Sequence, residues 1–379
     1  MAERKVTDEQ IIEALSTMGV AETARHFDMN VRSIERRKAS MVRKGWSPEH
    51  DMTHIVPDGF RLKGTSSLYK EGVKAPVLQW VKTSADAERQ AEIMRETVLA
   101  MSAEIVPEIA VKAPAHTLEQ LLNCYVITDY HLGMNSWGEE TGGDWDMKIA
   151  EELLVSWFSA AIAQAPDSRS AVFSQLGDFL HWDGISAVTP TSGHIVDADT
   201  RFQKLVRVAI CVIRRITSML LAKHEHVVLL MAEGNHDLAS SMWLREMFAA
   251  LYENEPRIEV ITRPDPYYCL EHGLTSLFFH HGHKKRIDSL ETVFIAKFRE
   301  VFGRTRFSYA HTGHLHHNVL RETNTMQLEQ HRTLAAPDAY ASRGGWMSGR
   351  DAKVITYHSQ FGEVGRLTIS SDMLKAGAA

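Results

Sequence analysis

Short apolar segments alternate with amphipathic segments from about residue 119 to the end of the chain. Between the first apolar segments, the spacing of apolar positions predicts helices near 147–164 and 201–223. This alternation is typical of an α/β fold in which functional side chains gather at the carboxyl ends of strands. The predicted strands are Cys124–Thr128, Ala171–Leu176, Val227–Ala232, Leu277–His281, Ser308–Thr312, Val354–His358 and Arg366–Ser370, the last two as a hairpin on a second sheet.

The first 46 residues follow a different pattern, in which apolar positions recur at helical spacing in three short segments. Thr7 to Gln10 match a capping box, which favours a helix start there, and Gly19 favours the end of that helix. A second short helix is expected over Ala21–Phe27, and a third helix is expected from Val31. We therefore predict a small all-α domain over residues 1–46.

Charge separates this N-terminal segment from the rest of the chain. The chain has 42 Lys and Arg residues against 48 Asp and Glu residues, a formal net charge of −6. Residues 1–46 hold 9 basic and 7 acidic residues, a net of +2, so the remainder carries −8. A basic helix joined to an acidic body is typical of a module that meets a polyanion, although a solvated helix face produces the same pattern.

Three short helices with a tight turn before the basic one resemble a helix-turn-helix module, whose last helix enters the major groove of DNA. Asp28 stands in the turn where such modules often have Gly. The resemblance implies DNA binding, and a helical bundle that docks to a protein is the alternative. The expected DNA contacts lie on the outer side of the third helix and are Arg32, Ser33, Arg36 and Arg37.

Residues 47–118 carry no continuous pattern, and we predict a linker with a β-hairpin and a spacer helix from Ala85 to about Ile105. The remaining residues, 119–379, form the predicted catalytic domain. The chain has 3 Cys without a CxxC spacing, which indicates a reducing compartment. No apolar run approaches the roughly 20 residues of a membrane span, and the charged N-terminus lacks the apolar core of a signal peptide. We expect a cytoplasmic protein with no membrane partner.

Polar clusters rich in His follow five of the predicted strands, in a chain that has 20 His residues. A single cluster of this kind is most often a surface pair or a buried structural histidine, but five at strand ends are difficult to explain in that way. Mixed carboxylate, imidazole and amide ligands suit Mn, Fe or Zn ions or a pair of them. The clusters are Asp129-Tyr130-His131, Gly177-Asp178 with His181, Gly234-Asn235-His236-Asp237, His280-His281-Gly282-His283 and Gly313-His314-Leu315-His316-His317.

The order DxH, GDxx, GNHD, HGH and GHxH over about residues 121–320 resembles the calcineurin-like metallophosphoesterase superfamily. The resemblance implies a four-layer α/β/β/α sandwich with two divalent metal ions, for which Mn is favoured and Fe, Zn and Ni also suit the ligands. It implies one ion held by Asp129, His131, Asp178 and His316, and a second held by Asp178, Asn235, His281 and His314, with Asp178 bridging.

The resemblance also implies the catalytic roles. His236 protonates the leaving oxygen, Asp237 orients His236, and a hydroxide that bridges the two ions attacks the phosphorus in line. His181 occupies a position where members of the superfamily often have Asp or Asn. We expect His181 and His283, the latter followed by three basic residues, to contact substrate.

The substrate must be inferred from features outside the metal site, because the whole superfamily shares that site. The GNHD form is shared by the nuclease of the bacterial double-strand-break repair complex, and the N-terminal module with residues 64–69 looks like metallophosphoesterases of bacteriophages and prophages. We therefore predict a DNA nuclease guided by the helix-turn-helix module, with a homo-oligomer expected by analogy. The alternatives are a phosphomonoesterase, a cyclic-nucleotide phosphodiesterase or a protein phosphatase. The last is disfavoured because Arg is missing from GDFLHWDG.

Overall fold

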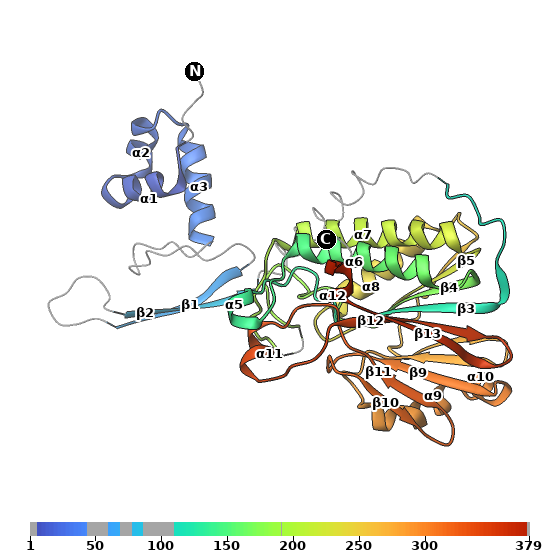
Figure 1. Cartoon of the computed structure of the whole chain (residues 1–379). Helices are drawn as coiled ribbons and strands as arrows, with labels where there is room; N and C mark the ends of the chain where they lie inside the picture. Colours follow the sequence, from blue (N-terminus) through green and yellow to red (C-terminus); the bar gives the residue numbers. More distant parts are fainter. Residues whose placement is uncertain (1–5, 44–59, 69–77, 86–109, 191, 377–379) are drawn as a thin grey trace. The chain divides into compact units, whose positions relative to one another are not determined.

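The computed structural model describes residues 6–43, 60–68, 78–85, 110–190 and 192–376, drawn in colour in Figure 1. The chain divides into two compact units, Met1–Val106 and Pro107–Ala379. The predicted spacer helix lies outside the described residues. No helix of the described part is long and apolar enough to cross a membrane.

The N-terminal unit begins with three short helices, α1 (Asp8–Thr17), α2 (Val20–His26) and α3 (Val31–Arg43). The capping box forms as predicted: the Thr7 hydroxyl accepts the Gln10 amide hydrogen, and the Gln10 side chain accepts the Thr7 amide hydrogen. Ile11, Ala24 and Ile34 are buried between the helices, together with Met41.

The turn between α2 and α3 contains Asp28 in the left-handed region, with φ of 51°. A short polar side chain such as Asp tolerates this region better than most residues. Asp28 therefore adopts the backbone conformation for which related turns use Gly. Later in this unit, β1 (Phe60–Leu68) pairs antiparallel with β2 (Leu78–Ala85).

The first sheet of the C-terminal unit has the order β13-β12-β3-β4-β5-β6. Its strands β3, β4, β5 and β6 run parallel, whereas β12 pairs antiparallel with β3 and with β13. The bounds are β3 (Leu118–Ile127), β4 (Ser168–Gln175), β5 (His226–Met231), β6 (Ile258–Val260), β12 (Asp351–His358) and β13 (Gly362–Ser370).

The second sheet has the order β10-β11-β9-β8-β7, with β8 parallel to β9 and β9 parallel to β11. Its bounds are β7 (Tyr268–His272), β8 (Thr275–Phe279), β9 (Phe307–Thr312), β10 (Val319–Glu322) and β11 (Gln327–Gln330). The prediction that the last two strands form a hairpin on this second sheet is wrong, because β12 hydrogen-bonds to β3 and extends the first sheet. A hairpin pattern does not specify which sheet edge the hairpin joins.

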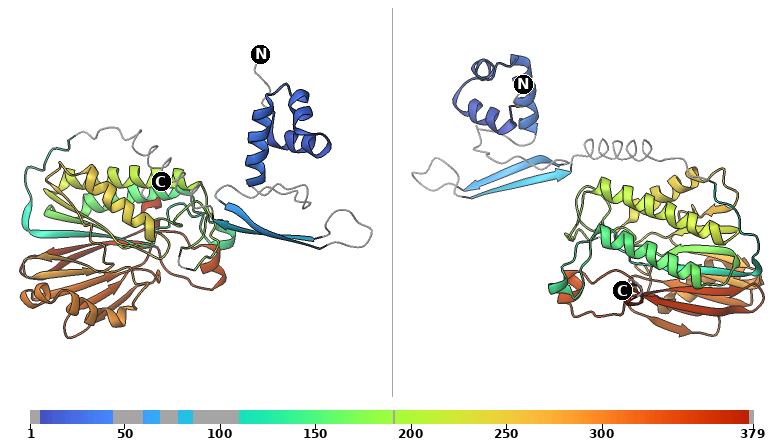
Figure 2. Two further views of the ribbon diagram at one scale, coloured as in Figure 1. Left: turned by 180° about the vertical axis from the view of Figure 1, so that it is seen from behind. Right: turned by 45° about the horizontal axis from the view of Figure 1, so that its top comes forward.

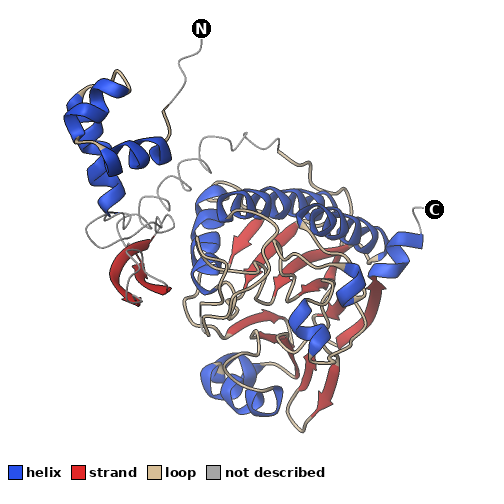
Figure 3. Ribbon diagram, turned by 90° about the vertical axis from the view of Figure 1, so that its left-hand side faces the viewer, coloured by secondary structure: helices blue, strands red, loops and turns tan. Residues whose placement is uncertain are grey.

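Helices cover the outer faces of both sheets, and Figure 3 shows the two sheets with helices on either side. On the first sheet, α6 (Met147–Gln164) and α7 (Phe202–Lys223) run side by side, as the views in Figure 2 show. Phe158 of α6 packs against Tyr125 and Phe173 of the sheet. On the second sheet, Phe294 of α9 (Leu290–Lys297) packs against Phe278. The other helices among the described residues of this unit are α5 (Gly138–Thr141), α8 (Leu238–Leu251), η2 (Ile287–Ser289), α10 (Arg299–Arg304), α11 (Ala339–Arg343) and α12 (Ser371–Ala376).

The main core lies between the sheets. Successive residues of a strand point to opposite faces, so Cys124 and Val126 face the second sheet while Tyr125 faces the helices. Leu277 and Phe279 of the second sheet belong to the same buried cluster as Cys124. The four layers are therefore helix, sheet, sheet and helix, which confirms the predicted α/β/β/α sandwich.

Candidate metal centre

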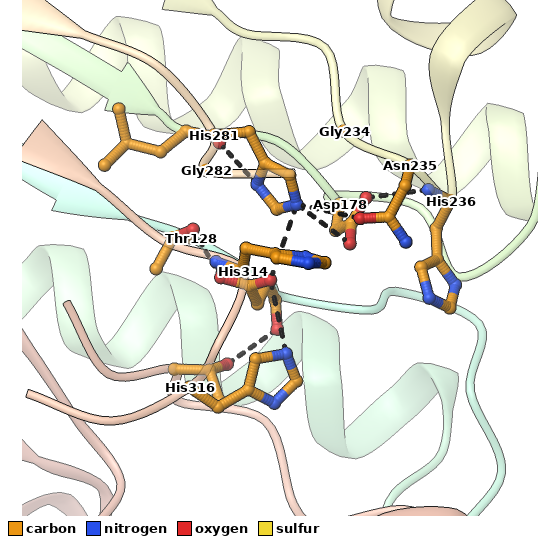
Figure 4. A network of polar contacts seen from close by, with 12 residues as sticks. Thr128, Asp178, Gly234, Asn235, His236, His281, Gly282, His314 and His316 are labelled. Carbon is orange, nitrogen blue, oxygen red and sulfur yellow. Dashed lines mark hydrogen bonds and ion pairs between the residues drawn. The ribbon is translucent and has the colours of Figure 1, made fainter. Parts of the chain in front are cut away.

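The polar residues that follow the strands converge at one edge of the sandwich. Asp129 and His131 follow β3, Asp178 follows β4 and Asn235 follows β5. His281 follows β8, and the pair His314 and His316 follows β9. Parallel strands end at the same edge of a sheet, and Figure 4 shows Asp178, Asn235, His281, His314 and His316 gathered there from separate loops. The structure thus brings together all seven predicted ligands.

One group consists of Asp129, Asp178, His281 and His314, whose ligand atoms lie within 4.8 Å of one another. His281 Nε2 lies 3.1 Å from Asp178 Oδ2 and 3.3 Å from Asn235 Oδ1. The His281 Nδ1 nitrogen is 2.8 Å from the Leu176 carbonyl, to which it donates, so Nε2 is the nitrogen that faces the group. This fixed orientation is the one that a metal-binding imidazole requires.

A second group consists of Asp129, His131 and His316. His316 Nε2 lies 3.2 Å from Asp129 Oδ1, and His131 Nε2 lies 3.4 Å from His316 Nε2. The two groups share Asp129, whereas the resemblance implies that Asp178 is shared. The Asp178 Oδ1 oxygen accepts the His236 amide hydrogen at 2.8 Å, and Oδ2 is the oxygen next to His281.

Most of the ligands have an unusual backbone conformation. Six described residues other than glycine have positive φ, and five of them are predicted ligands. A left-handed conformation at such residues is a strain of about 1–3 kcal/mol each, and it persists where the surrounding structure enforces it. The five are Asp129 (50°), His131 (48°), Asp178 (52°), His314 (73°) and His316 (54°).

Hydrogen bonds and close backbone approaches enforce these positions. The Asp129 Oδ2 oxygen accepts from the Thr128 hydroxyl at 2.6 Å and from the His314 amide at 2.7 Å. A Cβ atom at Gly313 would lie 1.8 Å from Thr128 Oγ1, and one at Gly234 would lie 1.9 Å from Asp178 Oδ1. Only glycine therefore fits at these two positions of the GH and GN motifs.

The charges of the site are strongly coupled. Burial by itself lowers the pKa of His281, but the nearby carboxylates of Asp178 and Asp129 raise this pKa to about 9. Burial by itself raises the pKa of Asp129. The charges of His316 and His281 lower this pKa by more, so it lies below its usual value. The carboxylates of Asp129 and Asp178 therefore favour positive charge on or beside the imidazoles that face them.

One buried atom tests whether this donor set fits a metal ion. Asp129 Oδ1 is buried without a hydrogen-bond partner among the described residues, and it faces His316 Nε2 at 3.2 Å and His281 Nε2 at 3.9 Å. An unsatisfied buried carboxylate oxygen is costly, and a divalent cation between it and the imidazoles would remove that cost. The mixed oxygen and nitrogen donors suit Mn, Fe or Zn.

Asp237 has contacts that differ from its predicted role of orienting His236. The Asp237 carboxylate accepts from the backbone amides of Asp178, Phe179 and Leu180 and of Gly234. Asp237 therefore holds together the loops that follow β4 and β5, because its carboxylate accepts backbone hydrogen bonds from both loops. His236 is instead oriented by the carbonyl of His181, which lies 2.8 Å from His236 Nδ1.

His181 and His283 occupy different places next to the ligands. His181 is buried, and its Nδ1 lies 3.2 Å from His131 Nδ1, so it supports a ligand from behind. Burial, followed by the charge of His236, lowers the pKa of His181 to about 3, and the neutral ring can accept from His131. The ring of His283 lies 5.3 Å from that of His281, and both His283 nitrogens are buried without a hydrogen-bond partner in the described residues.

The sequence did not point to several residues that build the site. Thr333 donates its hydroxyl to the Asp129 carbonyl at 2.6 Å, and no motif surrounds it. Thr128 directly precedes the DxH motif, and this adjacency was the only available signal. The carbonyl of His181 acts through the backbone and has no sequence signature.

The predicted DNA contacts of α3 separate into two kinds. Arg32 and Arg36 are exposed, and Ser33 is partly buried. Arg37 is paired with Asp8, with Nε 2.8 Å from Oδ1, and its Nη1 donates to the Val6 carbonyl at 2.9 Å. Arg37 thus makes contacts within its own domain, and its role as a DNA contact stays a prediction.

Comparison with known proteins yields structural likeness at low identity. No protein-family model matches the chain, and no curated protein matches it. The chain is similar to a solved Streptococcus pneumoniae protein described as a predicted phosphoesterase, at 10% identity and a TM-score of 0.31 over 66% of this chain and 91% of that chain. It is also similar to an archaeal phosphodiesterase, at 11% identity and a TM-score of 0.34 over 65% and 99%. A third similar structure is the 5'-nucleotidase of Candida albicans, at 11% identity and a TM-score of 0.34 over 70% of this chain and 54% of that chain. At such scores the chemistry must be inferred from the residues of the site.

Proposed function

We propose that this protein is a metal-dependent phosphodiesterase that hydrolyses nucleic acid, with DNA as its substrate. The observation that carries the proposal is the convergence of seven carboxylate, amide and imidazole side chains, five of them in left-handed backbone, around an unsatisfied carboxylate oxygen. A protein sustains this much local strain where function requires it. Two adjacent cation sites suit phosphoester hydrolysis, because together they can stabilise both the attacking and the leaving oxygen.

The chain's own residues would hold two divalent ions in the two groups that share Asp129. Asn235 Oδ1, near His281 Nε2, adds a neutral oxygen donor to the group that contains Asp178. Bound ions of this kind lower the pKa of a water molecule and stabilise negative charge on phosphoryl oxygens.

His236 is placed to donate a proton to the leaving oxygen. A carbonyl only accepts hydrogen bonds, so His236 Nδ1 carries the hydrogen that points to the His181 carbonyl. The Nε2 nitrogen is then the one available to the substrate. The His236 ring lies 4.7 Å from the ring of His131, a predicted ligand, so the doubly protonated ring would hold its Nε2 proton beside the groups that would bind the ions.

The N-terminal unit supports nucleic acid as the substrate. Its three helices pack around Ile11, Ala24 and Ile34, and Asp28 adopts the left-handed turn conformation of a helix-turn-helix module. Arg32 and Arg36 on α3 are exposed and available to a phosphate backbone. Small phosphoesters require no such module.

The test is an activity panel with the full-length protein and Mn²⁺. Its substrates are bis-p-nitrophenyl phosphate, p-nitrophenyl phosphate, single-stranded DNA and double-stranded DNA, and Asp178→Asn serves as the inactive control. We expect diester hydrolysis to exceed monoester hydrolysis, and we expect DNA cleavage that a chelator abolishes. Turnover of the monoester without cleavage of any DNA would instead assign a phosphomonoesterase, and turnover of neither ester would refute the metal centre.

A further inference from the structure

Three aromatic side chains on the segments around α5 and α11 are more than half exposed, and together we call them the aromatic rim. They are Trp137 (62%), Tyr340 (68%) and Trp346 (59%). Large aromatic side chains left in water on neighbouring segments usually mark a binding surface. The phosphodiester chemistry described above does not use them.

The aromatic rim lies at the sheet edge that carries the metal centre. Trp137 belongs to the segment that continues from Asp129 and His131 after β3. The segment with Tyr340 and Trp346 leads into β12. Because β12 runs antiparallel to β3, with Lys353 opposite Val126, the start of β12 lies at the edge where β3 ends.

Hydrogen bonds connect the two rim segments to each other. The Ser136 hydroxyl donates to the Pro337 carbonyl at 2.7 Å. Arg343 of α11 pairs with Glu140 of α5, with Nη2 2.7 Å from Oε1, and the Ser342 hydroxyl donates to the Glu140 carbonyl at 2.9 Å. The two segments therefore form one surface.

The same segments are also tied to the predicted ligands. Trp145 Nε1 donates to the His131 carbonyl at 3.3 Å, and Thr333, which precedes the Tyr340 segment, donates to the Asp129 carbonyl at 2.6 Å. A ligand held on the rim would thus keep a defined position relative to the metal centre.

The conformation of Trp346 is set before any ligand binds. Its backbone amide donates to the Ala341 carbonyl at 3.1 Å, and its ring centre lies 5.1 Å from that of Tyr340 at an angle of 53°. A Cβ atom at Gly344 would lie 2.8 Å from the Trp346 ring, so the ring rests on a glycine backbone. A side chain ordered in advance loses less entropy when it binds.

The charges near the rim favour a flat, uncharged partner group. Arg343 is paired with Glu140, and Arg332 is paired with Asp351 at 2.8 Å. These two cations are neutralised by carboxylates, and Arg350 of the same segment donates to the Leu334 carbonyl and lies over the Trp145 ring. The exposed groups of the rim itself are therefore aromatic faces. Aromatic faces stack on unpaired bases, whereas the bases of a duplex stack on one another and hide their faces.

We infer that the aromatic rim stacks on unpaired bases of a single-stranded DNA substrate whose phosphodiester lies at the metal centre. This inference rests on the proposed function, because it requires that DNA reaches the ions. It assigns to the C-terminal unit its own preference for single strands, separate from any duplex contact made by α3.

The test measures binding of a single-stranded oligothymidylate to the full-length protein in the presence of a chelator, so that cleavage cannot interfere. Fluorescence anisotropy of a labelled oligonucleotide is compared for the wild type, Trp346→Ala and Trp346→Phe. Phe361→Ala is the matched control, since Phe361 is also exposed (64%) but follows the far end of β12. We expect Trp346→Ala to weaken binding roughly 5- to 150-fold, as for loss of one base–aromatic stack. Trp346→Phe should retain most of the affinity.

The outcomes separate this inference from the proposed function. Equal binding by the wild type and Trp346→Ala, with DNA cleavage intact in Mn²⁺, would overturn the role of the rim alone. Turnover of bis-p-nitrophenyl phosphate with neither binding nor cleavage of DNA would overturn the nucleic-acid substrate itself. A wild-type dimer that Trp346→Ala converts to a monomer in sedimentation would show that the rim joins two copies of the chain, and this would also overturn the inference.

Discussion

Replacing Gly234 with alanine should disable the metal centre without unfolding the protein. Gly234 comes directly before the ligand Asn235 and faces the loop that holds Asp178. An added Cβ atom would lie 1.9 Å from Asp178 Oδ1 and 2.3 Å from the Asp178 backbone nitrogen. Rotation of the carboxylate cannot relieve both contacts, because one of them is to backbone.

The size of the effect follows from these distances. Ordinary contacts of a Cβ atom begin at 3.4 Å, so the backbone contact requires the two loops to separate by about 1.1 Å, the difference between 2.3 and 3.4 Å. Metal ligands must hold their distances within about 0.2 Å, and a misplacement of about 1 Å can reduce turnover roughly 100-fold. We therefore expect loss of the ion bound at Asp178 and at least a ~100-fold loss of kcat/KM. Overpacking should lower the free energy of unfolding by about 1–3 kcal/mol, which leaves the unit folded.

The assay combines calorimetric titration with Mn²⁺, metal content by mass spectrometry and turnover of bis-p-nitrophenyl phosphate, with circular dichroism to monitor folding. The matched control is Gly184→Ala, because a Cβ atom at Gly184 meets no atom within 4 Å. Gly184→Ala should bind Mn²⁺ and hydrolyse bis-p-nitrophenyl phosphate as the wild type does. If Gly234→Ala binds Mn²⁺ with the stoichiometry and affinity of the wild type, the close approach of the two loops is not what positions Asp178.

Three further predictions test other contacts. His236→Gln should lower kcat on DNA roughly 10²- to 10⁴-fold with Mn²⁺ binding retained. It should lower kcat less on bis-p-nitrophenyl phosphate, because the leaving group of that ester needs little protonation. Equal losses on both substrates would exclude a proton-donor role for His236. Burial holds the pKa of His224 at about 4, below its usual 6.5, so this histidine stabilises the fold above pH 6.5 and the contribution is lost as the pH falls toward 4. His224→Gln should therefore reduce the loss of unfolding free energy between pH 7 and pH 5 by about 2 kcal/mol in urea titrations, and an unchanged pH profile would contradict this. Arg37→Ala should speed amide hydrogen exchange in α1 and α3, because Arg37 binds Asp8 and the Val6 carbonyl. Arg36→Ala should leave the exchange rates unchanged and weaken DNA binding. Weaker DNA binding by Arg37→Ala with unchanged exchange rates would show that Arg37 contacts DNA.

The sequence predicted the elements that carry strong local patterns. The helix expected near 147–164 matches α6, and the seven predicted strands correspond to β3, β4, β5, β8, β9, β12 and β13. The strands β6, β7, β10 and β11 were missed because they are short and only partly apolar. Their positions are set by pairing with neighbouring strands, as β11 pairs with β9, and no pattern within a short segment encodes such a pairing.

The clusters that contain the candidate ligands could be located from the sequence because each cluster follows an apolar strand, and strand ends of a parallel sheet meet. The resemblance to the metallophosphoesterase superfamily then selected the ligands within these clusters. The roles of individual atoms could not be predicted from the sequence. Asp237 accepts four backbone amides instead of orienting His236, and Arg37 is paired within its domain, because each polar side chain takes the partners that folding brings near.

The sequence by itself determined the order of the ligands, the layered α/β class and the three-helix start of the chain, because these depend on short-range periodicity and on residues adjacent to strands. The tertiary structure decided which sheet β12 joins, that Asp129 Oδ1 faces both His316 and His281, and that Trp346 rests on Gly344 beside the metal-centre edge. These features arise from contacts between residues far apart in the chain. The energies of these contacts depend on interatomic distances of a few ångströms, which local sequence patterns do not specify.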